Sequence, residues 1–280
     1  MEAFLLEQKA KARTIGFVPT MGALHQGHLS LIESAKKACD ICVCSIFVNP
    51  NQFNDKEDLK KYPRTPEADI ALLEGAQCDV LFMPSVDEVY PEAIHTKYNF
   101  GYLDSILEGA HRPGHFNGVA QVVRRLFEIV QPHKAFFGSK DYQQVMVVKS
   151  LVQQLQMPIN IVACPILREP DGVAMSSRNT LLSPNERKLA GHIPVWMKHA
   201  AAMIRSGKSI AQTKQYINAE VIKHKDMNLD YFEICNANDL KILDDSSPCH
   251  SRIALIALFV GKIRLIDNIN IDEFESPQLN

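Results

Sequence analysis

Residues 14–48 read TIGFVPTMGALHQGHLSLIESAKKACDICVCSIFV, and this stretch decides the fold. The apolar runs at residues 14–20 and 41–48 have the length and the β-branched and aromatic content of buried strands. The segment between them, from His28 onward, has the amphipathic spacing of a helix that covers a sheet. Two buried strands joined by a helix form a βαβ unit, so the stretch predicts parallel strands covered by a helix.

The same alternation continues to about residue 165. Further helices are expected at residues 66–76, 118–130 and 142–155, and further strands at residues 79–84, 134–138 and 160–165. This order predicts an α/β protein with a Rossmann-like, doubly wound parallel sheet.

The pattern changes in the last third of the chain. Helical periodicity extends to about Lys225, and three closely spaced strand candidates follow at residues 231–236, 252–260 and 262–269. Pro170, Gly172 and Pro184 interrupt the chain between residues 168 and 184, where a linker is expected. We therefore predict a Rossmann-like domain of residues 1–175 and a smaller C-terminal α+β domain of residues 176–280.

Composition narrows the functional classes. The 280 residues carry a formal net charge of −2, so no general basic field favours nucleic acid. No apolar run approaches the roughly 18 residues of a membrane span, and the N-terminus lacks the pattern of a signal peptide. The seven cysteines are an odd number, which fits free thiols in a reducing cytoplasm. Cys42 and Cys44 lie on one strand without a second cysteine pair at zinc spacing, which argues against a zinc site.

Four polar clusters follow expected strands. They are PTMGALHQGH at residues 19–28, NPNQF at 49–53, FGSKDYQQ at 137–144 and MSSRN at 175–179. In a doubly wound sheet, ligands bind beyond the carboxyl ends of the strands. The four clusters therefore predict one shared site.

His25 and His28 stand at the start of the first crossover helix. A residue in the first helical turn lies beside unpaired N–H groups and the positive end of the helix dipole, which favours phosphate. Gly27 permits close approach of a ligand, and His25 can aim a ring nitrogen at the same point. A metal site and a buried histidine pair are the alternatives. The chain has neither a GxGxxG loop nor a Walker loop, so phosphates need another arrangement.

The other clusters supply suitable partners for a triphosphate. These are the cation of Lys140, the hydroxyls of Ser176 and Ser177, and the guanidinium of Arg178. Asp69 is the first candidate to recruit a divalent cation that shares phosphate oxygens, and Asp141 is a second. The alternatives are an exposed helix carboxylate for Asp69 and a helix cap for Asp141.

Three neutral amides complete the candidate site. Asn49, Gln52 and Gln144 suit the hydroxyl and carboxylate groups of a small acid, because an amide does not quench a nucleophilic carboxylate. Turn or cap chemistry is the alternative reading of each.

Six motifs together resemble the pantothenate synthetase family. PTMGALHQGH, FVNPNQF, YPRTPEAD, FFGSKDYQQ, MSSRN and RLIDN occur in the expected order over nearly the whole chain. HxGH with a later Ser-Ser-Arg is shared by a wider nucleotidyltransferase superfamily, whereas FVNPNQF and FGSKDYQQ are specific to this family.

The resemblance implies an ATP-dependent ligase that joins pantoate to β-alanine through a pantoyl-adenylate, with Mg²⁺, and releases AMP and pyrophosphate. Residues 1–175 would bind ATP and pantoate, and residues 176–280 would close over the site. The family pattern also implies a homodimer.

The resemblance also assigns residues. The catalytic set is His25, His28, Lys140, Ser176, Ser177 and Arg178. ATP would contact Met21, His28, Gly138, Lys140, Asp141, Met175, Ser176, Ser177 and Arg178. Pantoate would bind Gln52 and Gln144 with help from Asn49, and the carboxylate of β-alanine has Arg112 and His115 as candidates.

Two rival functions remain at this point. A nucleotidyltransferase of the same superfamily would move AMP onto another small substrate and would need a second phosphate pocket. An idle nucleotide-binding module would bind ATP without turnover. AMP release that depends on β-alanine would exclude both rivals.

Overall fold

The structure is a computed structural model that describes residues 1–53, 56–92 and 96–272. The chain divides into two compact units, Met1–Leu167 and Arg168–Asn280. This division falls a few residues before the 175/176 boundary that the sequence suggests. The reason is that Arg168 already belongs to the second unit: its guanidinium binds both carboxylate oxygens of Asp267, at 2.8 and 3.1 Å.

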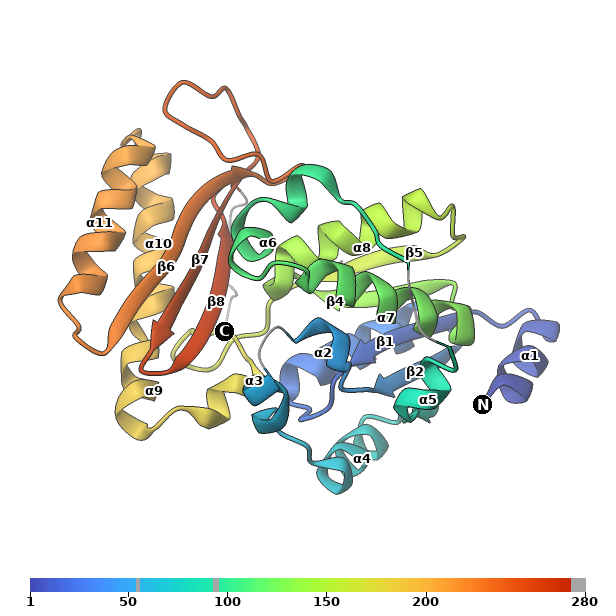
Figure 1. The fold of residues 1–280 in the computed structure, drawn as a ribbon. Helices are drawn as coiled ribbons and strands as arrows, with labels where there is room; N and C mark the ends of the chain where they lie inside the picture. Colours follow the sequence, from blue (N-terminus) through green and yellow to red (C-terminus); the bar gives the residue numbers. More distant parts are fainter. Residues whose placement is uncertain (54–55, 93–95, 273–280) are drawn as a thin grey trace. The chain divides into compact units, whose positions relative to one another are not determined.

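The first unit is built on a parallel sheet of five strands, in the order β3-β2-β1-β4-β5 (Figure 1). The strands are β1 (Ile15–Thr20), β2 (Ile41–Ile46), β3 (Val80–Phe82), β4 (Lys134–Gly138) and β5 (Asn160–Cys164). Each strand lies within a run that the sequence predicts as a strand. The doubly wound α/β class is therefore confirmed.

Helices pack on both faces of this sheet. The helices are α1 (Glu2–Ala10), α2 (Gln26–Ala38), α3 (Lys56–Lys61), α4 (Pro66–Gly75), α5 (Val86–Val89), α6 (Leu107–His111), α7 (His115–Val130) and α8 (Tyr142–Gln154), with 3-10 turns η1 (Pro50–Gln52), η2 (Gly101–Asp104) and η3 (Ser139–Asp141). Residues of α2 and α4 share a buried cluster with Val18 of β1, whereas residues of α7 and α8 share another with Phe17. Successive side chains of a strand point to opposite faces, which accounts for this division.

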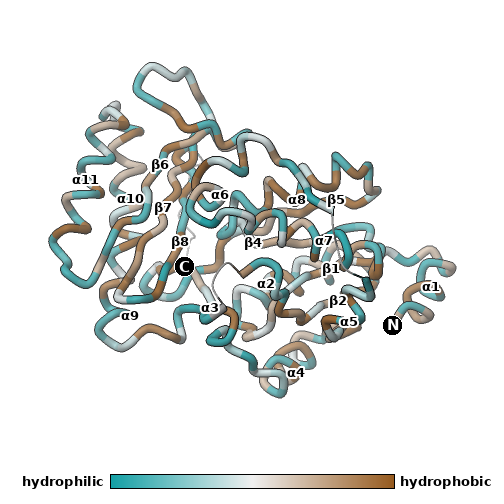
Figure 2. Tube along the Cα trace, viewed as in Figure 1, coloured by the Kyte–Doolittle hydropathy of each residue, from teal (hydrophilic) through white to brown (hydrophobic). Residues whose placement is uncertain are grey.

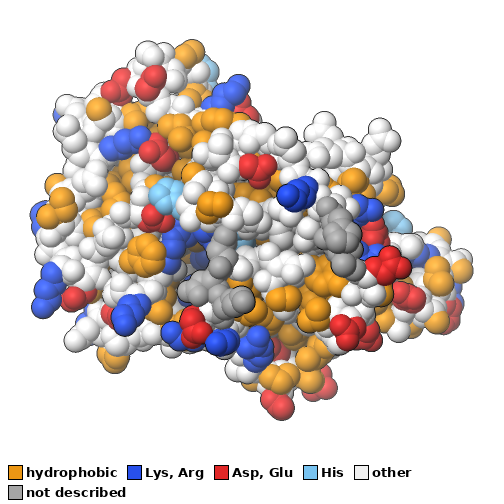
Figure 3. Space-filling view, viewed as in Figure 1, with side chains coloured by type: hydrophobic (Ala, Val, Ile, Leu, Met, Phe, Trp, Pro, Cys, Tyr) orange, Lys and Arg blue, Asp and Glu red, His pale blue; other side chains and the backbone are white. Residues whose placement is uncertain are grey.

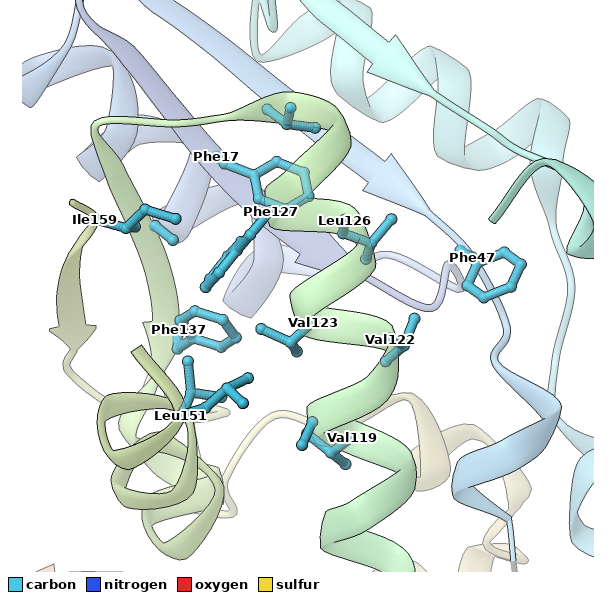
Figure 4. Packing of buried hydrophobic residues seen from close by; sticks show 14 of the residues in the cluster. Phe17, Phe47, Val119, Val122, Val123, Leu126, Phe127, Phe137, Leu151 and Ile159 are labelled. Carbon is cyan, nitrogen blue, oxygen red and sulfur yellow. The ribbon is translucent and has the colours of Figure 1, made fainter. Parts of the chain in front are cut away.

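Aromatic side chains join α7 to the sheet in the larger of these clusters (Figure 4). The ring of Phe127 lies 6.2 Å from that of Phe17 and 6.4 Å from that of Phe137, both edge to face. Val119 and Val123 of α7 extend the same buried face. This packing fixes α7, and the N-terminal turn of α7 carries site residues.

The second unit pairs three helices with an antiparallel sheet in the order β6-β7-β8. Its elements are η4 (Ser177–Leu181), α9 (Pro184–Ala190), α10 (His192–Arg205), α11 (Ile210–Ile222), β6 (Met227–Asn236), β7 (Arg252–Val260) and β8 (Ile263–Asn270). The central strand β7 is buried along most of its length and is hydrophobic in Figure 2. The predicted α+β character of this part is confirmed.

The distribution of surface charges fits the small formal net charge of −2. On the face drawn in Figure 3, Lys and Arg side chains are interspersed with Asp and Glu. Within the described ranges, no helix combines the length and the apolar character that crossing a bilayer requires.

Candidate active site

The strand order places the candidate site. β1 lies between β2 and β4, so the chain leaves β1 toward one edge of the sheet and later returns to build the other edge from β4. The loops after β1 and β4 diverge at this switch point, and open α/β sheets bind ligands at the carboxyl ends of the strands there. Residues 21–25 follow β1, and residues 139–141 follow β4.

The two histidines cap the helix that follows β1. His25 is the N-cap residue of α2, and its Nδ1 accepts the N–H of Gly27 at 3.1 Å. In return, Nδ1 of His28 accepts the N–H of His25 at 3.3 Å. An Nδ1 that accepts a hydrogen bond leaves the ring proton on Nε2. Each ring therefore keeps an Nε2–H donor. The centroids of the two rings are 4.1 Å apart.

Burial keeps both rings neutral. Burial, and after it the positive charge of Lys140, lowers the pKa of His25 to about 4; burial, and after it the charges of His25 and Lys140, lowers the pKa of His28 to about 3. Lys140 lies in η3, directly after β4, and its Nζ is 4.0 Å from Oδ1 of Asp141. The segments after β1 and β4 thus combine two neutral N–H donors with one cation, which suits an anion and does not suit a histidine-bound metal.

Asp69 of α4 anchors the loop that leads to the histidines. Its carboxylate is 1% exposed and accepts the N–H groups of Ala23 at 2.9 Å and Leu24 at 2.7 Å. The hydroxyl of Thr65 donates to the same carboxylate at 3.1 Å. Gly22 precedes this loop with φ +81, and a Cβ there would stand 3.0 Å from Asp69 Oδ2. Both carboxylate oxygens of Asp69, which the sequence indicates as candidate ligands of a cation, thus accept hydrogen bonds from the protein.

Asn49 is similarly committed to the protein. It is fully buried; its Oδ1 accepts the hydroxyl of Tyr90 at 2.9 Å, and its Nδ2 donates to the carbonyl of Gly118 at 3.1 Å. A Cβ on Gly118 would lie 2.2 Å from the carbonyl oxygen of Asn51, so only glycine fits where α7 meets η1. The sequence indicates neither Tyr90 nor Gly118 as a site residue.

Gln52 is held from two sides. Its Nε2 contacts Sδ of Met21 at 2.7 Å, which joins the loop after β1 to η1. Its backbone carbonyl lies 2.9 Å from Nδ1 of His115, at the start of α7. Nε2 of His115 in turn lies 3.2 Å from Nη1 of Arg112. Burial, followed by the charge of Arg112, lowers the pKa of His115 to about 4, so this ring is also neutral.

The two glutamines of α8 have different environments. Gln143 is buried and accepts the N–H of Glu108 at 2.9 Å while donating to the carbonyls of Leu103 and Ile106. Gln144 is half-buried, and its side chain makes no hydrogen bond within the described part of the chain. Gln143 therefore positions the loop before α6, and Gln144 keeps its amide available to a ligand. The sequence predicts Gln144 as the candidate substrate-binding residue, and it does not indicate the positioning role of Gln143.

The structure brings most of the predicted first-unit residues together. The charge of Asp141 acts on both His25 and His115, which links the histidine pair, η3 and the start of α7. Met175, Ser176, Ser177 and Arg178 belong to the second unit. There, Ser176 caps η4 by accepting the N–H of Arg178 at 3.2 Å, and Ser177 is buried.

Comparison with known proteins identifies the family. The model of the family described as pantoate-beta-alanine ligase matches residues 1–270. This chain belongs to the pantoate-beta-alanine ligase family. A pantothenate synthetase from Porphyromonas gingivalis is 46% identical over 273 residues, which cover 98% of this chain and 97% of the relative. One from Cytophaga hutchinsonii is 47% identical over 268 residues, 95% of each chain.

Solved structures of pantoate-beta-alanine ligases have the same fold. A crystal structure of pantothenate synthetase from Thermus thermophilus matches with a TM-score of 0.89 and 41% identity, covering 96% of this chain and 98% of that one. A ligase from Francisella tularensis, complexed with beta-gamma ATP and beta-alanine, matches with a TM-score of 0.78 and 35% identity, covering 98% and 96%. The resemblance expected from the sequence motifs is confirmed.

Proposed function

We propose that this chain is an ATP-dependent ligase that condenses pantoate with β-alanine and releases AMP and pyrophosphate. Membership of the pantoate-beta-alanine ligase family over residues 1–270 supports this reaction. The observation in the structure that carries it is the neutral pair of His25 and His28 beside Lys140, at the switch point of the sheet.

In the first step, the carboxylate of pantoate attacks the α-phosphorus of ATP. Negative charge increases on the phosphoryl oxygens and on the departing pyrophosphate. The Nε2–H groups of His25 and His28 and the ammonium of Lys140 are suited to stabilise this charge, because the reciprocal cap and burial hold both rings in place before ATP binds. We assign Ser176, Ser177 and Arg178 to the same phosphates on the basis of their hydroxyl and guanidinium chemistry.

In the second step, the amine of β-alanine attacks the acyl carbon of pantoyl-adenylate, and AMP leaves. No covalent enzyme intermediate is needed. Neutral histidines suit this step, since they can donate hydrogen bonds to the leaving phosphate without adding charge that would retain AMP. Met21, Gly138, Asp141 and Met175 are assigned to the ATP site by the family motifs.

Pantoate is assigned to the amides of Gln52 and Gln144. Gln144 has an uncommitted amide, and Gln52 is fixed by Met21 and His115. Asn49 supports this pocket as a scaffold, because its amide is already hydrogen-bonded on both sides. Arg112 is assigned to the carboxylate of β-alanine, with His115 positioning the guanidinium.

The residues present do not form a cage for a metal. Among the described residues, no group of three His, Cys, Asp or Glu side chains could hold an ion. We propose that Mg²⁺ arrives on ATP, with phosphate oxygens and water as its ligands, and neutralises phosphate charge. Asp69 is then assigned to the loop and not to the cation.

A homodimer in the cytoplasm completes the proposal. The seven cysteines are all free thiols, which fits a reducing compartment. Dimerisation is an expectation from the family resemblance, and light scattering of the purified protein tests it.

The decisive experiment measures AMP release with ATP and pantoate, with and without β-alanine. We expect multiple turnovers only with β-alanine, and pyrophosphate exchange with pantoate alone. Turnover that is independent of β-alanine would refute the ligase reaction.

A further inference from the structure

Two thiols outside the candidate site are in contact. Cys42 is on β2, and Cys78 lies in the turn between α4 and β3, 36 positions further along the chain. Their Sγ atoms are 4.0 Å apart. No cysteine has a role in the ligase reaction proposed above, so the pair calls for a separate explanation.

The backbone holds this pair in register. The N–H of Asp79 donates to the carbonyl of Cys42 at 3.2 Å, and the N–H of Cys42 donates to Oδ2 of Asp79 at 2.8 Å. The turn that carries Cys78 is thus fixed to β2 by reciprocal hydrogen bonds. The thiol contact is therefore a property of two secured backbone segments.

The two thiols differ in access and acidity. Cys42 is fully buried, whereas Cys78 is half-buried. The hydrogen bond between the thiols lowers the pKa of Cys78 and, with burial, raises that of Cys42. A thiolate at the accessible position is the nucleophilic form of cysteine. In the resting pair, the thiol of Cys78 donates toward Sγ of Cys42 at 4.0 Å and toward the carbonyls of Cys42 and Val80 at 3.5 Å. Oxidation therefore begins when Cys78 loses this proton.

We propose that Cys78 and Cys42 form a peroxide-reactive thiol pair, in which Cys78 is oxidised first and Cys42 then closes a disulfide. The oxidant is a small hydroperoxide such as hydrogen peroxide. The Cys78 thiolate attacks one peroxide oxygen, the O–O bond breaks, and hydroxide leaves, which gives a sulfenic acid. The sulfur of Cys42 then attacks the Cys78 sulfur as the S–O bond breaks. The hydroxyl group leaves with the Cys42 proton as water.

The net change is two thiols and one peroxide to one disulfide and two waters. The sulfurs must approach from 4.0 Å to the roughly 2.05 Å of a disulfide, by side-chain rotation and a small shift of the turn. A sulfenic acid without such a partner proceeds to sulfinic acid, which thiol reductants do not reverse. Cys42 thus makes oxidation of Cys78 reversible.

Peptide mass spectrometry after peroxide treatment of the full chain tests the pair. We expect a Cys42–Cys78 linked peptide that dithiothreitol removes. The Cys42→Ser variant should instead accumulate sulfinic acid on Cys78, and Cys78→Ser should leave Cys42 reduced. Cys39→Ser is the matched control, because Cys39 is also half-buried in the same cluster but burial raises its pKa. This control should form the disulfide at the wild-type rate.

Two results would overturn the proposal. One is a folded wild-type protein whose Cys42 and Cys78 both stay reduced at peroxide levels that oxidise free cysteine. The other is sulfinic acid at Cys78 to the same extent in the wild type and in Cys42→Ser, because Cys42 would then offer no resolving thiol.

Discussion

Replacing Asp69 with asparagine should weaken both the fold and the adenylation step. The carboxylate accepts two backbone N–H groups, at 2.9 and 2.7 Å, and one hydroxyl in a buried position. An amide has a single acceptor oxygen and turns its own N–H₂ group toward the other donor. A buried donor left unpaired costs about 1–3 kcal/mol, and we expect about 2–3 kcal/mol less free energy of unfolding because the lost bond involves a charge.

The catalytic consequence follows from the position of the anchored residues. Ala23 and Leu24 immediately precede His25, so a displaced loop moves both ring donors away from the phosphates. A misplacement of about 1 Å in an active site can cost about 10²-fold. We expect kcat for pyrophosphate exchange to fall by about 10- to 100-fold, with a smaller change in KM for ATP. The magnesium concentration for half-maximal activity should not change.

Denaturant unfolding and pyrophosphate exchange, each measured for Asp69→Asn and for Glu67→Gln, test this reasoning. Glu67 is an exposed carboxylate on the same helix, so its variant should behave like the wild type. Wild-type stability of Asp69→Asn, together with a strongly raised magnesium requirement, would refute the anchor and identify Asp69 as a ligand of the cation.

Four further expectations concern the same site. His25→Ala and His28→Ala should each raise the adenylation barrier by about 3 kcal/mol, the scale of one oxyanion donor, and near-wild-type pyrophosphate exchange in a folded variant would contradict this. In the wild type, the pKa values of His25 and His28 in the folded state, about 4 and about 3, lie below the ordinary 6.5, so the free energy of unfolding should fall as pH drops from about 6.5 toward 4. Denaturant unfolding at each pH measures this, and a flat profile would contradict buried neutral rings. Gln52→Ala and Gln144→Ala should weaken pantoate binding in calorimetry while ATP binding persists, and the opposite result would exchange the two pockets. Elemental analysis should find no stoichiometric zinc, and Mg²⁺ alone should restore activity removed by EDTA.

Strand positions were predictable because buried parallel strands are continuous apolar runs. The segments 134–138 and 160–165 illustrate this, since β4 and β5 lie within them. The short helices α3, α5 and α6 were not predicted. Helices of this length bury too few residues to give a periodic signal.

The proximity of the site residues within the first unit was also predictable, because polar residues after parallel strands meet at one edge of the sheet. Their individual hydrogen bonds were not. Asn49 is paired with Tyr90 and Gly118, which are 41 and 69 positions away in sequence. The usual sequence signals for a helix N-terminus do not predict the reciprocal cap of His25 and His28 either, since N-cap residues are normally Ser, Thr, Asp or Asn.

The close approach at Gly118 limits how the substrate range of this enzyme can be redesigned. A Cβ on Gly118 would lie only 2.2 Å from the carbonyl oxygen of Asn51, so α7 and η1 are in contact through their backbones. No side chain at this contact can be shortened to make room. A library that varies η1 to admit bulkier acids would have to shift a helix held by Phe127 against Phe17 and Phe137. Randomising Gln144 changes only a side chain on α8, so, with pantoate bound as proposed, altered acid specificity is more accessible from that helix than from η1.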